Sequence, residues 1–235
     1  MLVRLVCLLL LAAPACAQIG PFGPPGHSAS RFPAPAREVA SIISDRWGNE
    51  DSRERAGEAA RVLDFLHVAP GMTVADIGAG SGYYLPRLSA RVGPLGHVLA
   101  QDVVPSYLAA LDQRVRTEGL GNVQLGLGEV SDPRLPPASV DVAILIHMYH
   151  EIGQPFALMA NLIPALRPGA VVGIVDTTRQ TQYHGTPPTL LDCEMAAVGY
   201  RRVGTLQMES GREYLAVFAP PAVAPVPESV VPCRP

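Results

Sequence analysis

The sequence has no cluster of basic residues, no long run of one charge and no internal repeat. Its 235 residues carry 18 Lys and Arg against 21 Asp and Glu, which gives a formal net charge of −3 at pH 7. Proteins that bind nucleic acid usually carry a basic stripe or patch, so no nucleic-acid partner is expected. With 48% hydrophobic residues, the chain is long enough for one substantial domain and short for two.

Cysteine is also scarce, with four residues and no Cys-x-x-Cys spacing, so no zinc site of that type is expected. Cys7 and Cys16 lie in a segment that we expect to be removed. Cys193 and Cys233 remain, and an oxidising compartment would allow them to pair. However, Cys233 lies in a tail expected to be loose, and Cys193 lies in a helical stretch where a buried thiol is ordinary. We therefore expect no structural disulfide.

The apolar N-terminal stretch LVCLLLLAA is too short to span a bilayer comfortably. It follows one positive charge and precedes Ala15-Cys16-Ala17, the small-residue pattern that signal peptidase recognises. Residues 1–17 are therefore expected to be a cleaved export signal, with a periplasmic mature protein and no membrane span after cleavage. A lipoprotein attached through Cys16 is a weaker alternative, because Ala13 stands where such signals usually have Leu. A third alternative is that the segment is not cleaved and stays in the membrane as an anchor.

Gly and Pro residues are concentrated at both ends of the remaining chain. Residues 18–37 are interpreted as a mobile linker, residues 220–235 as a Pro-rich tail and residues 38–219 as the folded domain. In that domain, apolar stretches typical of strands alternate with amphipathic stretches typical of helices. Strands are expected at 72–78, 97–103, 122–129, 140–148 and 170–178, helices at 37–68, 82–93, 105–120, 154–169 and 188–200, and a closing hairpin at 200–220.

Continuous apolar strands separated by helices predict a parallel sheet that is covered on both faces. The closing hairpin makes the last strand antiparallel. The expected fold is a doubly wound, Rossmann-like α/β domain with a seven-stranded, mostly parallel sheet and a reversed last strand. Right-handed crossovers bring the carboxyl ends of the parallel strands to one edge, where such folds bind ligands.

Three glycines, Gly78, Gly80 and Gly82, directly follow the first expected strand in the segment VADIGAGSGYY. Such a loop lets a ligand approach the backbone closely. A dinucleotide fingerprint does not fit, because Tyr83 stands where that motif needs glycine. No Gly-Lys-Ser/Thr follows either, which excludes a Walker loop. A nicotinamide-dependent oxidoreductase is therefore disfavoured.

With Asp76 two residues before its first glycine, DIGAGSG resembles the first motif of the class I S-adenosylmethionine-dependent methyltransferases. The resemblance covers nearly all of residues 60–219, and it is closest to small exported bacterial members. It implies S-adenosyl-L-methionine as cofactor and methyl transfer as activity. The segments that occur in the family's order are VLDFLHVAPGMTVADIGAGSGYY, GLGNVQLGLGE, LPPASVDVAILIHMYHEI and ALRPGAVVGIVD.

A cofactor site follows from this resemblance and from the chemistry of S-adenosylmethionine. The glycine loop would admit the amino-acid end to backbone amides, and Asp76 would engage its ammonium group. Asp102, at the end of the second strand, is placed to accept both ribose hydroxyls. Glu129 would accept from the adenine amine, although the family more often has Asp there, and Val130 would add a backbone contact and apolar packing. The alternatives to these cofactor contacts are that Asp76 caps a turn, that Asp102 caps a helix and that Glu129 is a solvated surface residue.

The segment IHMYHEI after the fourth strand is similar in position to the family's fourth motif, which borders the acceptor pocket. A methyl transfer needs an aligned acceptor and excluded water, and a base only where the acceptor keeps a proton. His150 is therefore expected as base or acceptor-orienting group, Tyr149 as pocket wall or donor and His147 as a further candidate. No third ligand is evident beside the two histidines, so no metal site is expected. Purely structural histidines are the alternative.

Weaker candidates flank this site. Tyr83 and Tyr84 follow the glycine loop, and the segment with Trp47 and Arg53 belongs to a region that often closes over the site in this family. His184 lies in a short loop after the fifth strand, which suggests a lid. Because this loop is short, little sequence is available to build an acceptor pocket, and a small-molecule acceptor is expected. A non-catalytic exported binding module with the same fold is the alternative to an enzyme.

Overall fold

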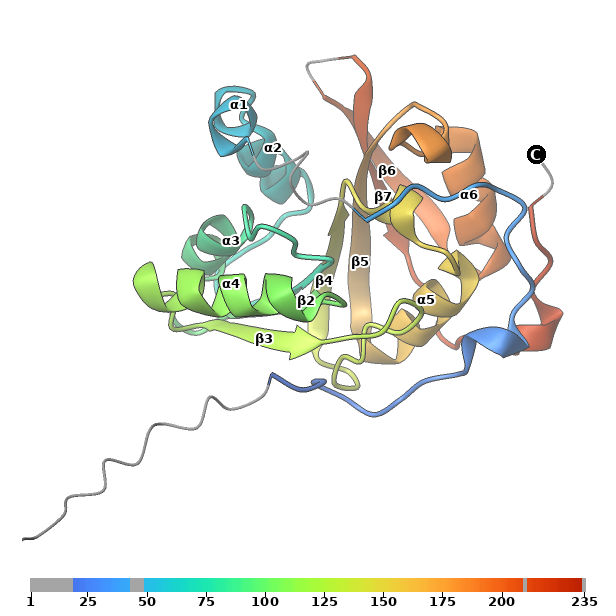
Figure 1. Cartoon of the computed structure of the whole chain (residues 1–235), viewed down its shortest axis with the longest axis horizontal. Helices are drawn as coiled ribbons and strands as arrows, with labels where there is room; N and C mark the ends of the chain where they lie inside the picture. Colours follow the sequence, from blue (N-terminus) through green and yellow to red (C-terminus); the bar gives the residue numbers. More distant parts are fainter. Residues whose placement is uncertain (1–18, 43–48, 209–210, 234–235) are drawn as a thin grey trace, which may run out of the picture.

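The computed structural model describes residues 19–42, 49–208 and 211–233. Its centre is a seven-stranded sheet in the order β3-β2-β1-β4-β5-β7-β6 (Figure 1). Neighbouring strands from β3 to β5 are parallel, whereas β7 runs antiparallel to β5 and β6. This confirms the predicted doubly wound α/β fold with a reversed last strand. The expected export signal at 1–17 and Trp47 lie outside the described residues.

The strands and helices agree closely with the predicted ranges in the middle of the chain. The strands are β1 (Thr73–Ile77), β2 (His97–Asp102), β3 (Val123–Leu127), β4 (Val140–Ile146), β5 (Leu166–Thr177), β6 (Arg201–Gln207) and β7 (Glu213–Ala219). The helices are α1 (Glu50–Arg55), α2 (Glu58–Phe65), α3 (Leu85–Val92), α4 (Pro105–Thr117), α5 (Pro155–Leu162) and α6 (Pro188–Ala197). In the described parts of the chain, every helix is too short or too polar to cross a bilayer.

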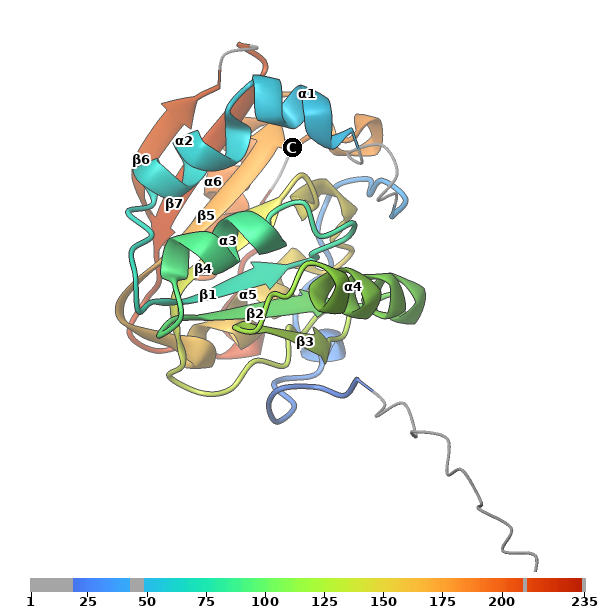
Figure 2. The same ribbon diagram turned by 90° about the vertical axis from the view of Figure 1, so that its left-hand side faces the viewer.

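Two apolar cores cover the two faces of the sheet. Successive side chains of a strand point to opposite faces, so Val74 of β1 packs with one core and Ala75 with the other. The first core lies under α2, α3 and α4, and the second lies under α5 and α6 (Figures 1 and 2). Burial on both faces is the reason why the central strands are continuously apolar.

The single helix expected at 37–68 is instead two short helices, α1 and α2. Gly57 separates them in the left-handed conformation, with φ of +61°. Asn49 caps α1, because its side chain accepts a hydrogen bond from the Ser52 amide at 3.1 Å. The helix expected at 154–169 also ends early, at Leu162, because Pro164 falls in a 3-10 turn before β5 begins.

Residues 19–42, here called the N-terminal strap, lie against the domain instead of forming the expected mobile linker. The Leu127 amide donates to the Gly20 carbonyl at 3.0 Å, so that the strap covers the exposed edge of β3. The Gly26 amide donates to Asp132 Oδ2 at 2.7 Å, and Phe32 is buried in the core beneath α5. Apolar and hydrogen-bonding contacts thus offset the flexibility that its Gly and Pro content suggested.

The C-terminal tail is also packed, and the expectation of no structural disulfide was wrong. Cys193 of α6 and Cys233 form a disulfide. Val230 and Cys233 are buried, and Glu228 pairs with Arg31 of the N-terminal strap at 2.8 Å. Composition alone suggested a loose tail, but these contacts bring Cys233 to Cys193.

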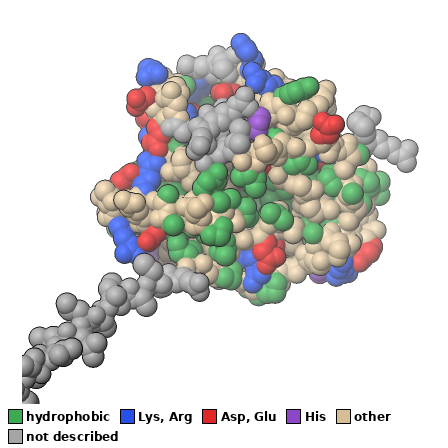
Figure 3. Space-filling model, viewed as in Figure 1, with side chains coloured by type: hydrophobic (Ala, Val, Ile, Leu, Met, Phe, Trp, Pro, Cys, Tyr) green, Lys and Arg blue, Asp and Glu red, His purple; other side chains and the backbone are tan. Residues whose placement is uncertain are grey.

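The face seen in Figure 1 carries hydrophobic side chains across its middle, and its arginines lie mostly toward the rim (Figure 3). The described residues of this face therefore show no basic stripe of the kind that tracks a phosphate backbone. The expectation of no nucleic-acid partner stays a prediction.

Candidate functional site

The glycine loop turns sharply between β1 and α3, and all three glycines adopt left-handed backbone conformations. The φ angles are +69° at Gly78, +55° at Gly80 and +81° at Gly82. A Cβ atom at position 78 would lie 2.9 Å from Met148 Cε, and one at position 82 would lie 2.5 Å from Leu111 Cδ2. The left-handed conformation favours glycine at all three positions, and at 78 and 82 a Cβ atom would also displace the end of a neighbouring side chain.

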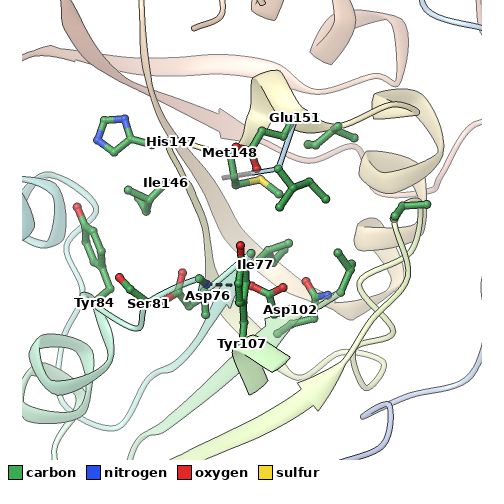
Figure 4. A pocket seen from close by; sticks show the side chains of 18 of the residues that line it. Asp76, Ile77, Ser81, Tyr84, Asp102, Tyr107, Ile146, His147, Met148 and Glu151 are labelled. Carbon is green, nitrogen blue, oxygen red and sulfur yellow. Dashed lines mark hydrogen bonds between the residues drawn. The ribbon is translucent and has the colours of Figure 1, made fainter. Parts of the chain in front are cut away.

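A cavity of about 320 Å³ opens beside this loop, at the carboxyl ends of β1, β2 and β4 (Figure 4). Such a volume is within the range of small-molecule sites. Gly82 does not line the cavity, since it packs behind the loop against α4. The predicted residues that line it are Asp76, Gly78, Gly80, Asp102, Glu129, Val130 and His147.

Asp76 is a buried carboxylate without an ordinary partner. Its side chain is 3% exposed, and no hydrogen bond or ion pair from a described residue reaches it. Its pKa is raised to about 7, mainly by burial; the charge of Arg53 opposes this shift, and the charge of Asp102 adds to it. A cationic ligand would stabilise the charged form, so this position fits the ammonium group of S-adenosylmethionine.

Asp102 is held in place by backbone amides. Oδ2 accepts a hydrogen bond from Gly80 N–H at 2.9 Å, and Oδ1 accepts one from Val104 N–H at 2.9 Å. Burial raises the pKa of its carboxyl, and the backbone hydrogen bonds oppose that shift. Asp76 and Asp102 both line the same cavity (Figure 4). A fixed carboxylate at this strand end is the arrangement that binds a ribose diol.

Gln101 is a cavity residue that the sequence analysis missed. Its Nε2 is buried and has no hydrogen-bond partner among the described residues. A Cβ atom on Gly128 would lie 2.1 Å from that nitrogen, so glycine at 128 leaves the space that the amide occupies. An unpaired buried donor beside a cavity is satisfied by an acceptor on a bound ligand.

Glu129 and Val130 lie at the rim of the cavity. Arg134 forms an ion pair with the Glu129 carboxylate, and the Glu129 amide donates to the Asp132 carbonyl at 2.8 Å. Val130 is 66% exposed. Both residues are where the sequence analysis expected them, although the carboxylate of Glu129 already has a cationic partner.

A buried network around Glu58 joins α1 and α2 to the cavity. Arg53 donates to both carboxylate oxygens of Glu58, at 2.5 and 3.0 Å, and the Tyr84 hydroxyl donates at 3.0 Å. His147 Nε2 lies 3.5 Å from the same carboxylate. Burial alone would raise the pKa of Glu58, but the hydrogen bonds and charges of His147 and Arg53 lower it to about 2.

The sequence analysis named Arg53 and Tyr84 only as weaker candidates and missed Glu58. A signal was present, because Glu58 is four residues before Val62 and therefore lies on the apolar face of α2. A charged residue on such a face implies a buried partner. The Arg53 guanidinium also lies 3.9 Å from the centroid of the Tyr83 ring, which places both groups at the cavity wall.

The three residues expected to be catalytic are divided among three environments. His147, whose φ is +54°, lies just before a 3-10 turn (Tyr149–Glu151) and next to Glu58. Tyr149 is fully buried in the core beneath α5, with the Arg37 guanidinium 5.6 Å from its ring centroid. The residues of this segment that line the cavity are Ile146, His147, Met148, Glu151 and Ile152, and the first four are labelled in Figure 4.

His150 is fully buried beside the cavity wall and is oriented by Asp176. Its Nδ1 lies 3.0 Å from Asp176 Oδ1, and its ring packs edge-to-face against His184 with centroids 5.3 Å apart. Asp176 lies near the end of β5 and was not predicted, because the sequence gives no sign that this strand residue faces the turn after β4. His147 and His150 thus contact different carboxylates.

Comparisons with known proteins agree with this geometry. A family described as a methyltransferase domain matches residues 74–169. Nocamycin O-methyltransferase of Saccharothrix syringae is 30% identical over 166 residues, which are 71% of this chain and 53% of that protein. Arsenite methyltransferase of Halobacterium salinarum is 27% identical over 157 residues, or 65% of this chain and 40% of that one. The chain thus spans about half or less of the length of these relatives.

A crystal structure of a SAM-dependent methyltransferase from Aquifex aeolicus has the same fold. It matches with a TM-score of 0.69 at 24% identity, covering 76% of this chain and 98% of that one. The matched segment 74–169 contains the glycine loop, Asp102 and the turn with His150. Residues 74–169 of this chain therefore match a methyltransferase domain, and the folded domain has the fold of S-adenosylmethionine-dependent methyltransferases, which implies S-adenosylmethionine as cofactor.

Proposed function

We propose that this protein transfers the methyl group of S-adenosylmethionine to a small-molecule acceptor. The observation that carries the proposal is the convergence of Asp76, Asp102 and the glycine loop on one cavity. Asp76 would hold the ammonium group and Asp102 the ribose hydroxyls. Gln101 would donate to the nucleoside, while Glu129 and Val130 border the adenine end.

The acceptor would enter on the side of the cavity formed by Met148, Glu151 and Gly153. The loop between β5 and α6 is short, and the described residues include no inserted subdomain over this side. A small acceptor suits such a site, in which alignment and exclusion of water supply most of the rate enhancement. His150, with Nδ1 held by Asp176, is buried behind this end of the cavity and would position the turn that carries Met148 and Glu151.

We also propose that the mature protein is exported. The signal-like residues 1–17 suggested this, and the disulfide between Cys193 and Cys233 supports it, because such bonds persist mainly in oxidising compartments. Export also favours one alternative function, a binding module that retains the cofactor cavity without turnover, since S-adenosylmethionine is made from ATP inside the cell.

Calorimetric titration of the full mature chain with S-adenosylmethionine and S-adenosylhomocysteine tests the proposal. Asp102→Ala should weaken binding of either compound at least ~10-fold, because a charge-assisted hydrogen bond contributes about 1.5–3 kcal/mol. Asp64→Ala, an exposed change on α2, is the matched control and should bind normally. No heat from either compound at high concentration would contradict the proposal.

Release of S-adenosylhomocysteine during incubation with pools of small phenols, thiols, amines and arsenite distinguishes the two functions. Turnover with any pool supports methyl transfer. Tight cofactor binding without release from any pool would support the binding module instead.

A further inference from the structure

We infer that His150, Glu151 and His184 form a binding site for a divalent transition-metal ion of the zinc type, in the wall of the cavity. One ligand atom from each of these residues lies within 4.8 Å of the other two. The sequence analysis found no third ligand for a metal, because His184 is 34 positions from His150 and only the fold brings it close. The inference concerns metal binding and does not require that methyl transfer occurs.

The orientation of His150 is the first argument. Asp176 is fully buried, and its oxygens also accept hydrogen bonds from Thr177 N–H at 2.8 Å and from the Thr186 hydroxyl at 2.7 Å. A carboxylate held in this way can only accept from His150, so Nδ1 carries a proton and Nε2 keeps a lone pair. A carboxylate behind the distal nitrogen is the arrangement that orients histidine ligands of metals.

The surroundings of Nε2 are the second argument. This atom is buried, has no hydrogen-bond partner among the described residues and lies 3.9 Å from Glu151 Oε1. A metal ion at this position would accept the Nε2 lone pair and take Glu151 as a second ligand.

His184 offers a second nitrogen ligand. Its ring packs at 88° to that of His150, in a left-handed backbone conformation with φ of +57°. A metal ion bound to Nε2 of His150 would gain this nitrogen as a further ligand. Two imidazoles and one carboxylate are a common ligand set of zinc sites that keep a position open.

The distances fit a site that closes slightly around its ion. Ligands in a tetrahedral zinc site with bonds of about 2.1 Å are roughly 3.4 Å apart. The present separations of up to 4.8 Å therefore need small rotations of the Glu151 and His184 side chains, both of which are partly exposed. Because Glu151 lines the cavity, an open position on the ion would face the acceptor side.

Metal titration of the full mature chain with its disulfide intact tests the inference. After treatment with a chelator, one equivalent of Co²⁺ should give a visible absorption spectrum typical of low coordination number, and Zn²⁺ should abolish it. His150→Gln and His184→Gln should each weaken Zn²⁺ binding by more than ~10-fold. Asp176→Asn should weaken it by about 10- to 100-fold, because that residue only orients a ligand. The matched control is His97→Gln, an exposed histidine at the start of β2, which should change nothing.

Glu151→Gln provides a variant that keeps the buried residues intact, and it should also weaken Zn²⁺ binding. The melting temperature and the heat of S-adenosylhomocysteine binding report whether each variant is folded. Absence of Co²⁺ absorption and of Zn²⁺ heat would overturn the inference. Equal affinity of His150→Gln and the unmodified chain would overturn it as well. Zn²⁺ uptake without S-adenosylhomocysteine binding would contradict only the proposed methyl transfer.

Discussion

Replacement of Asp76 by Asn should stabilise the cofactor-free protein and weaken cofactor binding at the same time. Asp76 is buried without a hydrogen-bond partner among the described residues, and its pKa is raised from 3.8 to about 7. The native protein therefore binds a proton more tightly than the unfolded chain does. The resulting cost in stability is absent below about pH 4, grows as the pH rises to 7 and is complete above pH 7.

The magnitude follows from the pKa. At 1.36 kcal/mol per pKa unit, the charged Asp76 carboxylate costs on the order of 4 kcal/mol of unfolding free energy above pH 7. The side-chain amide introduced by Asp76→Asn would stay unpaired, which costs about 1–3 kcal/mol. The net gain of about 1–3 kcal/mol corresponds to a rise of roughly 3–10 °C in the melting temperature of a domain of this size. The lost charge should weaken S-adenosylhomocysteine binding by about 10- to 100-fold.

Scanning calorimetry of cofactor-free protein at pH 5 and pH 8, with titration calorimetry at pH 8, measures both effects. The difference in melting temperature between Asp76→Asn and the unmodified chain should be larger at pH 8. Asp64→Asn is the matched control; it removes only an exposed ion pair with Arg91 and should shift stability by less than ~1 kcal/mol at either pH. A lower melting temperature of Asp76→Asn at pH 8, or unchanged cofactor affinity, would refute the reasoning.

Three further predictions concern stability alone. Gly82→Ala should lower the free energy of unfolding in urea by about 2–4 kcal/mol, because the contact with Leu111 adds to the strain of a left-handed backbone. Gly119→Ala is the control: its backbone is also left-handed, but the space around it is open, so it should cost only about 1–2 kcal/mol. Cys233→Ser should lower unfolding free energy by about 4 kcal/mol, as expected for a disulfide with a sequence separation of 40, and a reductant should then have no further effect. Glu58→Gln should destabilise the protein by about 3 kcal/mol above pH 5, seen as a lower melting temperature, because the pKa of Glu58 is about 2 instead of the usual 4.5. The difference in stability should vanish as the pH falls toward 2. A difference that stays constant with pH would contradict this origin.

The parallel sheet was predictable because its signals are local. The apolar strands from β1 to β5 and the glycines after β1 need no knowledge of distant residues, and their ranges were confirmed within a few positions. Composition misled at the two ends of the chain. Gly and Pro favour flexible segments, but contacts with distant residues hold both ends: Gly26 bonds to Asp132, 106 positions away, and Arg31 pairs with Glu228, 197 positions away.

The cofactor side of the site was predictable for a related reason. Asp76 and Asp102 end neighbouring parallel strands, so the topology brings them to one edge. The acceptor side was not predictable from local patterns. His150 depends on Asp176 from β5 and on His184 from the following loop. Such pairings are fixed by tertiary packing alone.

The salt bridge between Arg37 and Glu194 sets the practical N-terminal limit of the folding unit. The two side chains are 4% and 1% exposed, and Arg37 also donates to the carbonyls of Tyr149 and Ile152 at either end of the turn that carries His150. A shortened protein that began at residue 38, the domain boundary inferred from composition, would leave the Glu194 carboxylate buried without its cation, a loss of about 3–5 kcal/mol. Recombinant versions of this domain therefore need to begin before Arg37.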